Sequence, residues 1–221
     1  MSGVSAADTV LDVACGPGVL ACAFASVAKH VTGIDATPHM LEKAQRLQAN
    51  NGVANVVWRL CNGYRLPFPE STFSLLITRY AFHHFEQPHA VLREMVRVCQ
   101  PAGRVVVIDS APPPDKAHAF NSIEKRRDPS HTKALTQEEL TDLMHSAGLV
   151  IEKRHPYAWE VSAESLLARS FPADDDREGI YQAYEEDAGV DSTAMNPRFI
   201  DGTLHVTFPT LITVARKPAG R

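Results

Sequence analysis

The sequence predicts an α/β fold in which a mostly parallel sheet carries helices on both faces. Two observations support this prediction. Short apolar runs rich in β-branched residues alternate with longer stretches whose apolar residues recur at helical spacing. One run, Arg104 to Asp109 (RVVVID), is almost wholly apolar, as expected of a central strand that is covered on both faces. A doubly wound sheet of this kind binds ligands at the carboxyl ends of its strands.

The first half of the chain follows a regular order of strands and helices. Thr37-Pro38 opens one helix, because Thr favours the cap position and Pro the first turn. Pro101-Ala102-Gly103 ends another helix. We expect strands over 9–14, 30–35, 56–61, 73–78 and 104–109, and helices over 19–28, 37–50 and about 91–99.

The second half is less regular. A polar stretch over 115–131 is expected to be helical in part, and Thr136 to Glu139 forms a capping box that opens a further helix. Two last strands are expected over 149–153 and 204–216. The acidic segment between them is interpreted as a solvated helical excursion. The prediction is therefore a single domain over 1–221, with a seven-stranded sheet whose last strand is antiparallel, a core over 9–110, and covering segments over 111–148 and 156–203.

Composition limits the classes of function. The 221 residues are 44% hydrophobic and 22% charged, with a net charge of −4. This composition is typical of a globular domain, and the absence of a basic stripe argues against nucleic-acid binding. No apolar run is long enough for stable membrane insertion. Four widely spaced cysteines predict reduced thiols in a cytoplasmic protein, and ten scattered histidines predict no metal site.

The segment Leu11 to Leu20 (LDVACGPGVL) places a glycine turn between a strand and a helix. This layout is typical of nucleotide pockets, because helix N–H groups face the ligand. Gly16 to Ala21 satisfies G-x-G-x-x-A, and Asp35 follows 19 residues after Gly16, so an NAD(P)-dependent oxidoreductase is one hypothesis. Three observations oppose it: Asp12 interrupts the first strand, no Tyr-x-x-x-Lys pair occurs, and the chain is short for an added substrate domain.

Five motifs in register carry a resemblance to a known family. Val10 to Gly18 resembles motif I of the class I S-adenosylmethionine-dependent methyltransferases, and Asp35 ends the next strand as in that family. The segments 62–69, 73–85 and 92–109 resemble its later motifs in the same order. The match covers 9–110 and is strongest for the ubiquinone/menaquinone-biosynthesis type. It implies a Rossmann-like sheet that binds S-adenosylmethionine, with S-adenosylhomocysteine as product, and in-line methyl transfer to a small molecule. A non-catalytic cofactor-binding module and a homodimer stay open.

The resemblance also implies a set of cofactor-binding residues. Asp12 would engage the charged amino end of the cofactor, Asp35 the ribose hydroxyls, and Met40 the adenine. Asn62 stands where most members carry Asp. The expected cofactor-binding residues are Asp12, Ala14, Cys15, Gly16, Gly18, Asp35, Ala36, Met40, Asn62, Gly63, Tyr64 and Arg79.

Catalytic side chains are expected directly after the fourth strand. A histidine there has a suitable pKa for a general base. The candidates are Arg79, Tyr80, His83 and His84. Arg127, His131 and Tyr157 are candidate substrate contacts. The family carries covering helices before the first strand, which here begins near Thr9. We therefore expect the cover to come from 111–131 or 161–198, the first being favoured, or from residues upstream.

Overall fold

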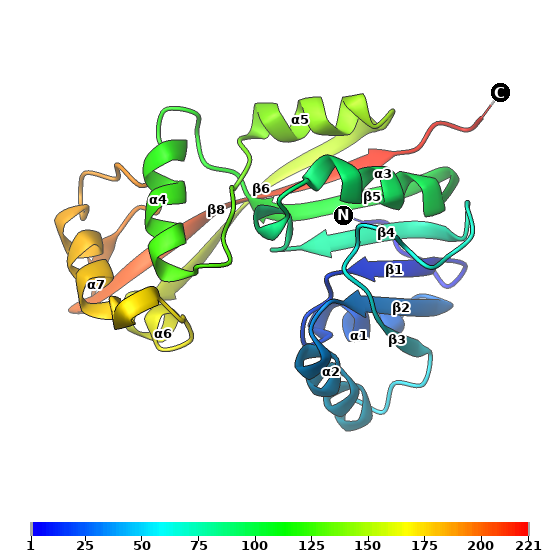
Figure 1. Ribbon diagram of the computed structural model, residues 1–221, viewed down its shortest axis with the longest axis horizontal. Helices are drawn as coiled ribbons and strands as arrows, with labels where there is room; N and C mark the ends of the chain where they lie inside the picture. Colours follow the sequence, from blue (N-terminus) through cyan, green and yellow to red (C-terminus); the bar gives the residue numbers. More distant parts are fainter. Residues whose placement is uncertain (1, 221) are drawn as a thin grey trace.

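The computed structural model describes residues 2–220 and contains one mixed sheet of eight strands (Figure 1). Its main path has the order β3-β2-β1-β4-β5-β8-β6, and β7 pairs with β8. The first five strands are parallel, and β8 runs antiparallel to both of its neighbours. The strands are β1 (Thr9–Val13), β2 (His30–Asp35), β3 (Val56–Leu60), β4 (Phe73–Arg79), β5 (Cys99–Ser110), β6 (Val150–Ser162), β7 (Arg198–Ile200) and β8 (Thr203–Arg216).

The predicted fold class is confirmed, but the expected number of seven strands is wrong. The additional strand is β7, which forms a tight hairpin with the start of β8. Asp201 and Gly202 connect the two strands, and both have positive φ values, 49° and 78°. Two such residues give the primed turn that matches the twist of paired strands. The Asp-Gly pair was the available sequence signal for this hairpin.

Helices cover both faces of the parallel strands. One face packs against α1 (Val19–Ala25), beside which lies α2 (Pro38–Asn50). The opposite face packs against α3 (Pro88–Val98) and α5 (Gln137–Ser146). Helix α5 begins at the predicted capping box, in which Thr136 and Glu139 satisfy each other's backbone N–H groups. Leu140 and Met144 of α5 belong to the main core. This helix therefore packs against the sheet, although it falls within the segment 111–148 that was expected to cover the site.

A second hydrophobic core lies at the far end of β6 and β8. It joins α4 (Ala117–Arg127), α6 (Ala163–Leu167) and α7 (Arg177–Glu186). Elsewhere in the chain, η1 (Phe82–His84) and η2 (Ala173–Asp175) are short 3-10 helices. The interpretation of the acidic segment as a solvated excursion is therefore wrong. Ile180 and Tyr184 of α7 are fully buried in this core. The sequence around them is polar because only one face of this short helix packs inward.

The length of β6 and β8 positions the second core. Ser110 at the end of β5 pairs with Thr210, so residues 203–209 of β8 extend beyond the carboxyl end of β5. The predicted strand over 149–153 continues to Ser162 as the partner of this extension. Figure 1 shows α4, α6 and α7 gathered at that end of the molecule. We call these helices, with β7 and the outer parts of β6 and β8, the second lobe.

Three expectations concern absent features. All four cysteines are free within residues 2–220, with Cys15, Cys22 and Cys99 buried and Cys61 half-buried. Across the same residues, no helix has the length and apolar character to cross a membrane. The described part of the chain also holds no group of three or more His, Cys, Asp or Glu side chains that would suit a metal ion.

Candidate active site

The glycine turn after β1 forms the floor of the site. Ala14, Gly16 and Gly18 have positive φ values of 56°, 52° and 78°. A Cβ added to Gly18 would meet a ring carbon of Trp58 at 2.5 Å and the Cβ of Ala44 at 2.8 Å, so only glycine fits. A Cβ added to Gly16 would meet nothing within 4 Å. Gly18 therefore allows close packing, whereas Gly16 leaves open space above the turn.

The Asp35 carboxylate is held at the end of β2 by two backbone amides. The N–H of Gly16 donates to Oδ2 at 2.8 Å, and the N–H of Thr37 donates to Oδ1 at 2.9 Å. The bond from Gly16 joins the turn after β1 to the end of β2, and the two bonds together fix the buried carboxylate. Each carboxylate oxygen has a further lone pair for a donor in the cavity.

Asp12 in β1 is an unusual buried carboxylate. Its side chain is almost completely buried, with 1% exposure, and its Oδ2 has no hydrogen-bond partner within residues 2–220. Burial raises the pKa of Asp12 to about 7, although the charge of Arg79 and the backbone N–H of Ala21 oppose the rise. An unpartnered buried oxygen of this kind is costly unless a ligand supplies a donor.

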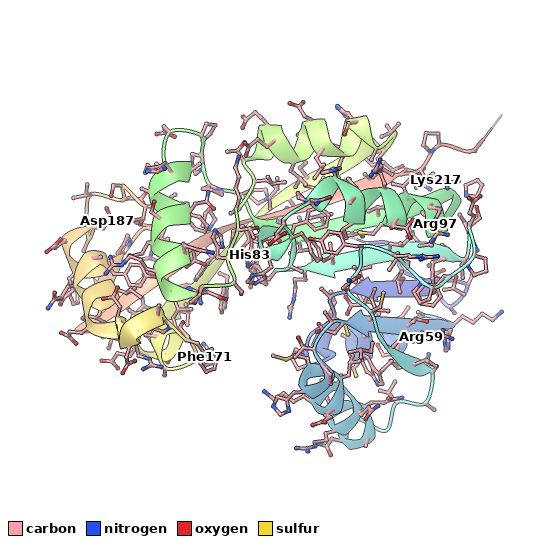
Figure 2. The ribbon with its side chains drawn as sticks, viewed as in Figure 1. Arg59, His83, Arg97, Phe171, Asp187 and Lys217 are labelled. Carbon is pink, nitrogen blue, oxygen red and sulfur yellow. The ribbon has the colours of Figure 1, made fainter. Side chains whose placement is uncertain are left out.

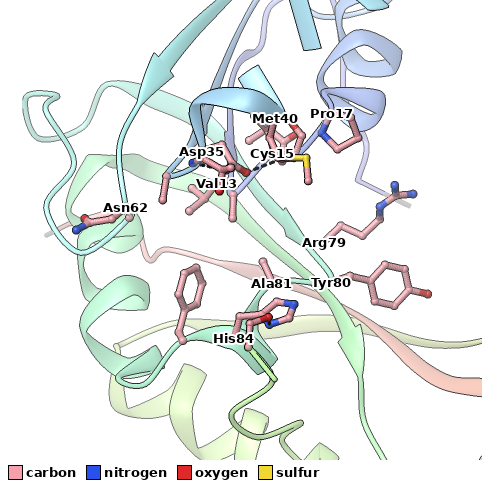
Figure 3. Close-up of a pocket in the computed structure, with 18 of the residues that line it drawn as sticks. Val13, Cys15, Pro17, Asp35, Met40, Asn62, Arg79, Tyr80, Ala81 and His84 are labelled. Atoms are coloured by element: carbon pink, nitrogen blue, oxygen red, sulfur yellow. Dashed lines mark hydrogen bonds between the residues drawn. The ribbon is translucent and has the colours of Figure 1, made fainter. Parts of the chain in front are cut away.

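These groups line a cavity of about 1030 Å³ between the sheet and the second lobe (Figure 3). From the lobe side, the cavity is lined by Arg127, Asp128 and Ser130 and by the segment Arg169 to Phe171. The Phe171 side chain is 80% exposed, and Figure 2 shows it at the edge of the lobe. The expected cofactor-binding residues that line this cavity are Asp12, Ala14, Cys15, Gly16, Asp35, Ala36, Met40, Asn62, Gly63, Tyr64 and Arg79. Gly18 lies behind them, against Trp58.

Asn62 differs from the two carboxylates in its surroundings. Its side chain is exposed, and its Oδ1 already accepts a hydrogen bond from the backbone N–H of Tyr64 at 3.2 Å. The Tyr64 ring packs edge-on against Phe85, with 5.9 Å between the ring centroids. Asn62 therefore shapes its own loop and offers the cavity a weaker acceptor than a carboxylate.

A smaller cavity of about 310 Å³ adjoins the first one beneath the second lobe. The two cavities share Tyr80, His84 and Arg127 among their lining residues. One wall is aromatic, because the rings of Trp159 and Phe208 stack at 5.1 Å between centroids. The ring centroids of Tyr80 and Trp159 lie 5.8 Å apart, and the Tyr80 hydroxyl forms a hydrogen bond of 2.8 Å with Thr210 Oγ1. The other wall is polar.

A buried ion pair forms part of that polar wall. Arg127 donates from Nε and Nη2 to the two oxygens of Glu124, each at 2.7 Å. Both residues are on α4. Burial alone would lower the pKa of Arg127, but the hydrogen bonds to Glu124 outweigh it and raise the pKa. The charge of Arg127 is thus compensated within the second lobe.

The two histidines of η1 have different partners. His83 is buried, and its Nδ1 lies 2.5 Å from Oδ1 of Asp109. The other oxygen of Asp109 accepts the backbone N–H groups of Ala81 and Phe82, at 3.1 and 2.7 Å. His84 lines both cavities, and its Nδ1 lies 3.1 Å from Oγ of Ser130. The structure thus brings all four residues predicted after β4 to the site.

Two of the three predicted substrate contacts lie elsewhere. The Nε2 atom of the buried His131 is 2.7 Å from Oδ1 of Asn121, and its ring lies 5.3 Å from that of His83. Burial lowers the pKa of His131 to about 4. Tyr157 lies on β6 at a separate surface depression. Only Arg127 lines the two central cavities.

Sequence reasoning missed several residues of the site. Asp109 ends an apolar strand in the same way as Asp35, so a signal for it was present. Arg169, Phe171 and Phe208 had no local signal. They reach the site only because the extended β6–β8 pair brings the second lobe over the parallel strands.

Comparison with known proteins identifies the family. A family model described as a methyltransferase domain matches residues 11–107. The Bacillus subtilis (strain 168) protein named uncharacterized methyltransferase YcgJ is 30% identical over 174 residues, which cover 77% of this chain and 69% of that protein. The chain belongs to the methyltransferase family. The expected family is therefore confirmed, and the oxidoreductase alternative is not favoured.

Other relatives of this methyltransferase are more distant or longer. Demethylmenaquinone methyltransferase of Tropheryma whipplei (strain Twist) is 35% identical over 117 residues, which cover 51% of this chain and 46% of that protein. The chain thus matches about half the length of that relative. The solved structure of BH2331 from Bacillus halodurans C-125, which is described as a methyltransferase by assignment only, superimposes on this chain with a TM-score of 0.88 at 25% sequence identity. This superposition covers 98% of this chain and 95% of that one.

Proposed function

We propose that this methyltransferase transfers the methyl group of S-adenosylmethionine to a small, planar ring compound that carries a hydroxyl group. The observation that carries the proposal is the pairing of two buried carboxylates in one cavity. Asp12 presents an oxygen without a partner, and Asp35 presents a carboxylate that two amides hold in place. S-adenosylmethionine carries a cationic amino group and two adjacent ribose hydroxyls, which are the donors that these acceptors require.

The chain's own residues fit this cofactor. The open space above Gly16 would receive the methionine portion, because no side chain occupies it. Asp12 would bind the amino group, and Asp35 the ribose hydroxyls. Met40 and Tyr64 would pack against the adenine, near the loop that begins at Asn62. When bound, S-adenosylmethionine supplies an electrophilic methyl carbon on a positively charged sulfur.

The smaller cavity is the proposed acceptor site. Its volume of about 310 Å³ lies at the lower end of the range for small-molecule pockets. The stacked Trp159 and Phe208 offer a flat apolar wall, and the polar wall with His84 offers hydrogen bonds to a hydroxyl group. Relatives named as demethylmenaquinone methyltransferases support a quinol-type ring. The rigid walls would align the acceptor for in-line displacement, and the second lobe would exclude water.

Calorimetry tests the cofactor assignment. We expect S-adenosylmethionine and S-adenosylhomocysteine to bind in the micromolar range, about −7 to −9 kcal/mol, and NAD to show no heat of binding. Binding of NAD alone would refute the proposal. Incubation with radiolabelled S-adenosylmethionine and 1,4-naphthohydroquinone then tests the acceptor class, with an aliphatic hydroxy acid as control. Cofactor binding without transfer to any ring acceptor would instead favour the non-catalytic binding module.

Two further predictions concern the state of the protein in the cell. A homodimer stays a prediction, and light scattering of the purified protein measures it directly. The cytoplasmic location also stays a prediction, consistent with the four free cysteines. Fluorescence microscopy of the tagged protein would test it.

A further inference from the structure

The two histidines of η1 are neighbours in space as well as in sequence. Their ring centroids lie 4.1 Å apart. His83 is buried against Asp109, whereas His84 is half-buried and lines both the cofactor cavity and the acceptor cavity. Figure 3 shows the His84 ring close to Ala81, at the edge of the cavity that Arg79 and Tyr80 also line. The two rings therefore come from adjacent residues of one 3-10 helix but have different neighbours: His83 lies against the carboxylate of Asp109, and His84 faces the cavities.

His83 carries the positive charge of this pair. Burial alone would lower the pKa of His83, but the charge and hydrogen bond of Asp109 at 2.5 Å outweigh burial and raise it. The pKa of Asp109 is lowered in turn: burial opposes this shift, and the charge and hydrogen bond of His83 together with backbone N–H donors outweigh it. The result is an imidazolium–carboxylate pair beneath His84.

The hydrogen-bond partners of Ser130 define the tautomer of His84. Ser130 Oγ donates its single proton to Oδ1 of Asp128 at 2.6 Å. A hydroxyl group has one proton, so the same oxygen must accept the hydrogen bond that joins it to Nδ1 of His84 at 3.1 Å. The proton of a neutral His84 therefore resides on Nδ1. Its Nε2 atom is left with a free lone pair.

We propose that His84 is the general base of the reaction, and that Asp128, Ser130, His83 and Asp109 are positioning residues that hold it as the neutral, Nδ1-protonated tautomer. This inference rests on the proposed function for its acceptor. Nε2 takes the proton of the acceptor hydroxyl, and the freed electron pair of the acceptor forms the bond to the methyl carbon. The carbon–sulfur bond breaks, and its electron pair returns to sulfur. The proton then leaves His84 for solvent.

The charged groups around His84 favour this state on balance. Burial lowers the pKa of His84, and the positive charge of His83 lowers it further. A hydrogen bond that His84 donates to the backbone of Ser130 and the negative charges of Asp128 and Asp109 oppose the shift. The Glu124–Arg127 pair of α4 compensates itself, and the pKa of His131 is lowered far enough to keep that residue neutral near pH 7. His84 is therefore uncharged at neutral pH and able to accept a proton.

Nuclear magnetic resonance of the wild-type protein tests the inference without any acceptor. Nitrogen-15 shifts of the histidine rings at pH 7 should show His83 protonated on both nitrogens and His84 protonated on Nδ1 alone. The pKa of His84 should rise by about one pH unit in His83→Gln, because a positive charge about 4 Å away is lost. His145→Gln, which replaces an exposed histidine on α5, is the matched control and should leave the His84 titration unchanged. A His84 ring protonated on Nε2, or a charged His84 at pH 7, would overturn the proposal.

Kinetics with 1,4-naphthohydroquinone supply the second readout. His84→Gln should lower kcat about 100-fold or more, a far larger effect than any change in the affinity for S-adenosylhomocysteine. In His83→Gln, the acidic limb of the pH–rate profile should move upward with the pKa of His84. A profile that stays in place while the His84 pKa moves would show that His84 is not the base. A protein that binds no S-adenosylmethionine would contradict the proposed function instead, and the ring tautomers would still decide the state of His84.

Discussion

Replacement of Asp35 by alanine gives the sharpest test of the cofactor site. In the structure, each oxygen of this carboxylate accepts one backbone N–H and has one lone pair left for a ribose hydroxyl. A hydrogen bond to a charged acceptor contributes about 1.5 to 3 kcal/mol, so loss of two such bonds costs about 3 to 6 kcal/mol. The Kd for S-adenosylhomocysteine in Asp35→Ala should therefore rise at least about 100-fold. Asn62→Ala removes an exposed, neutral acceptor that already bonds to Tyr64, and its Kd should rise no more than about fivefold.

Isothermal titration calorimetry of both variants measures these differences. Asp35→Ala also leaves the N–H groups of Gly16 and Thr37 without their acceptor, so thermal unfolding of the free protein must accompany the titration. The binding defect should exceed what the loss of stability explains. Equal losses of affinity at Asp35 and Asn62 would refute the reasoning, because the ribose would then lie elsewhere in the cavity.

Three further predictions concern stability and movement. Gly18→Ala should lower the free energy of unfolding in urea by about 3 kcal/mol, through overpacking and a left-handed backbone, whereas Gly16→Ala should cost about 1 kcal/mol. Burial of Asp8 alone would raise its pKa. Hydrogen bonds from Ser74, Arg104 and Ser5 outweigh burial and lower this pKa from 3.8 to about 2. The stabilisation of about 2 kcal/mol is thus complete above pH 4 and lost as the pH falls toward 2, and acid titration of Asp8→Asn should lack this step. Added S-adenosylhomocysteine should slow amide hydrogen exchange over 126–131 and 169–171, and unchanged exchange there would show that the second lobe does not cover the cofactor.

Local sequence patterns were sufficient to predict most residues that line the larger cavity, which is the proposed cofactor site. The glycine turn, Asp35 and the histidines after β4 all follow directly from a strand end, so the topology of a parallel sheet brings them together. The smaller cavity, which is the proposed acceptor site, depends on long-range geometry. Trp159 and Phe208 meet because β6 and β8 continue beyond the carboxyl end of β5. The strand that was expected to end at Lys153 continues to Ser162. The polar surroundings of Ile180 and Tyr184 likewise concealed a second core, since two buried residues on a short helix give a weak periodic signal.

The position of β8 between β5 and β6 has a consequence for biosynthesis. Both edges of β8 are hydrogen bonded, yet its residues 203–216 leave the ribosome after all the strands that it joins. Until then β5 and β6 each have an unsatisfied edge, and the outer part of the second core lacks Leu204, Val206 and Phe208. Because domains fold as their segments emerge, we expect the parallel half to become structured on the ribosome first, while the second lobe waits until β8 has emerged. Protease protection of stalled chains ending before and after residue 216 would reveal this order.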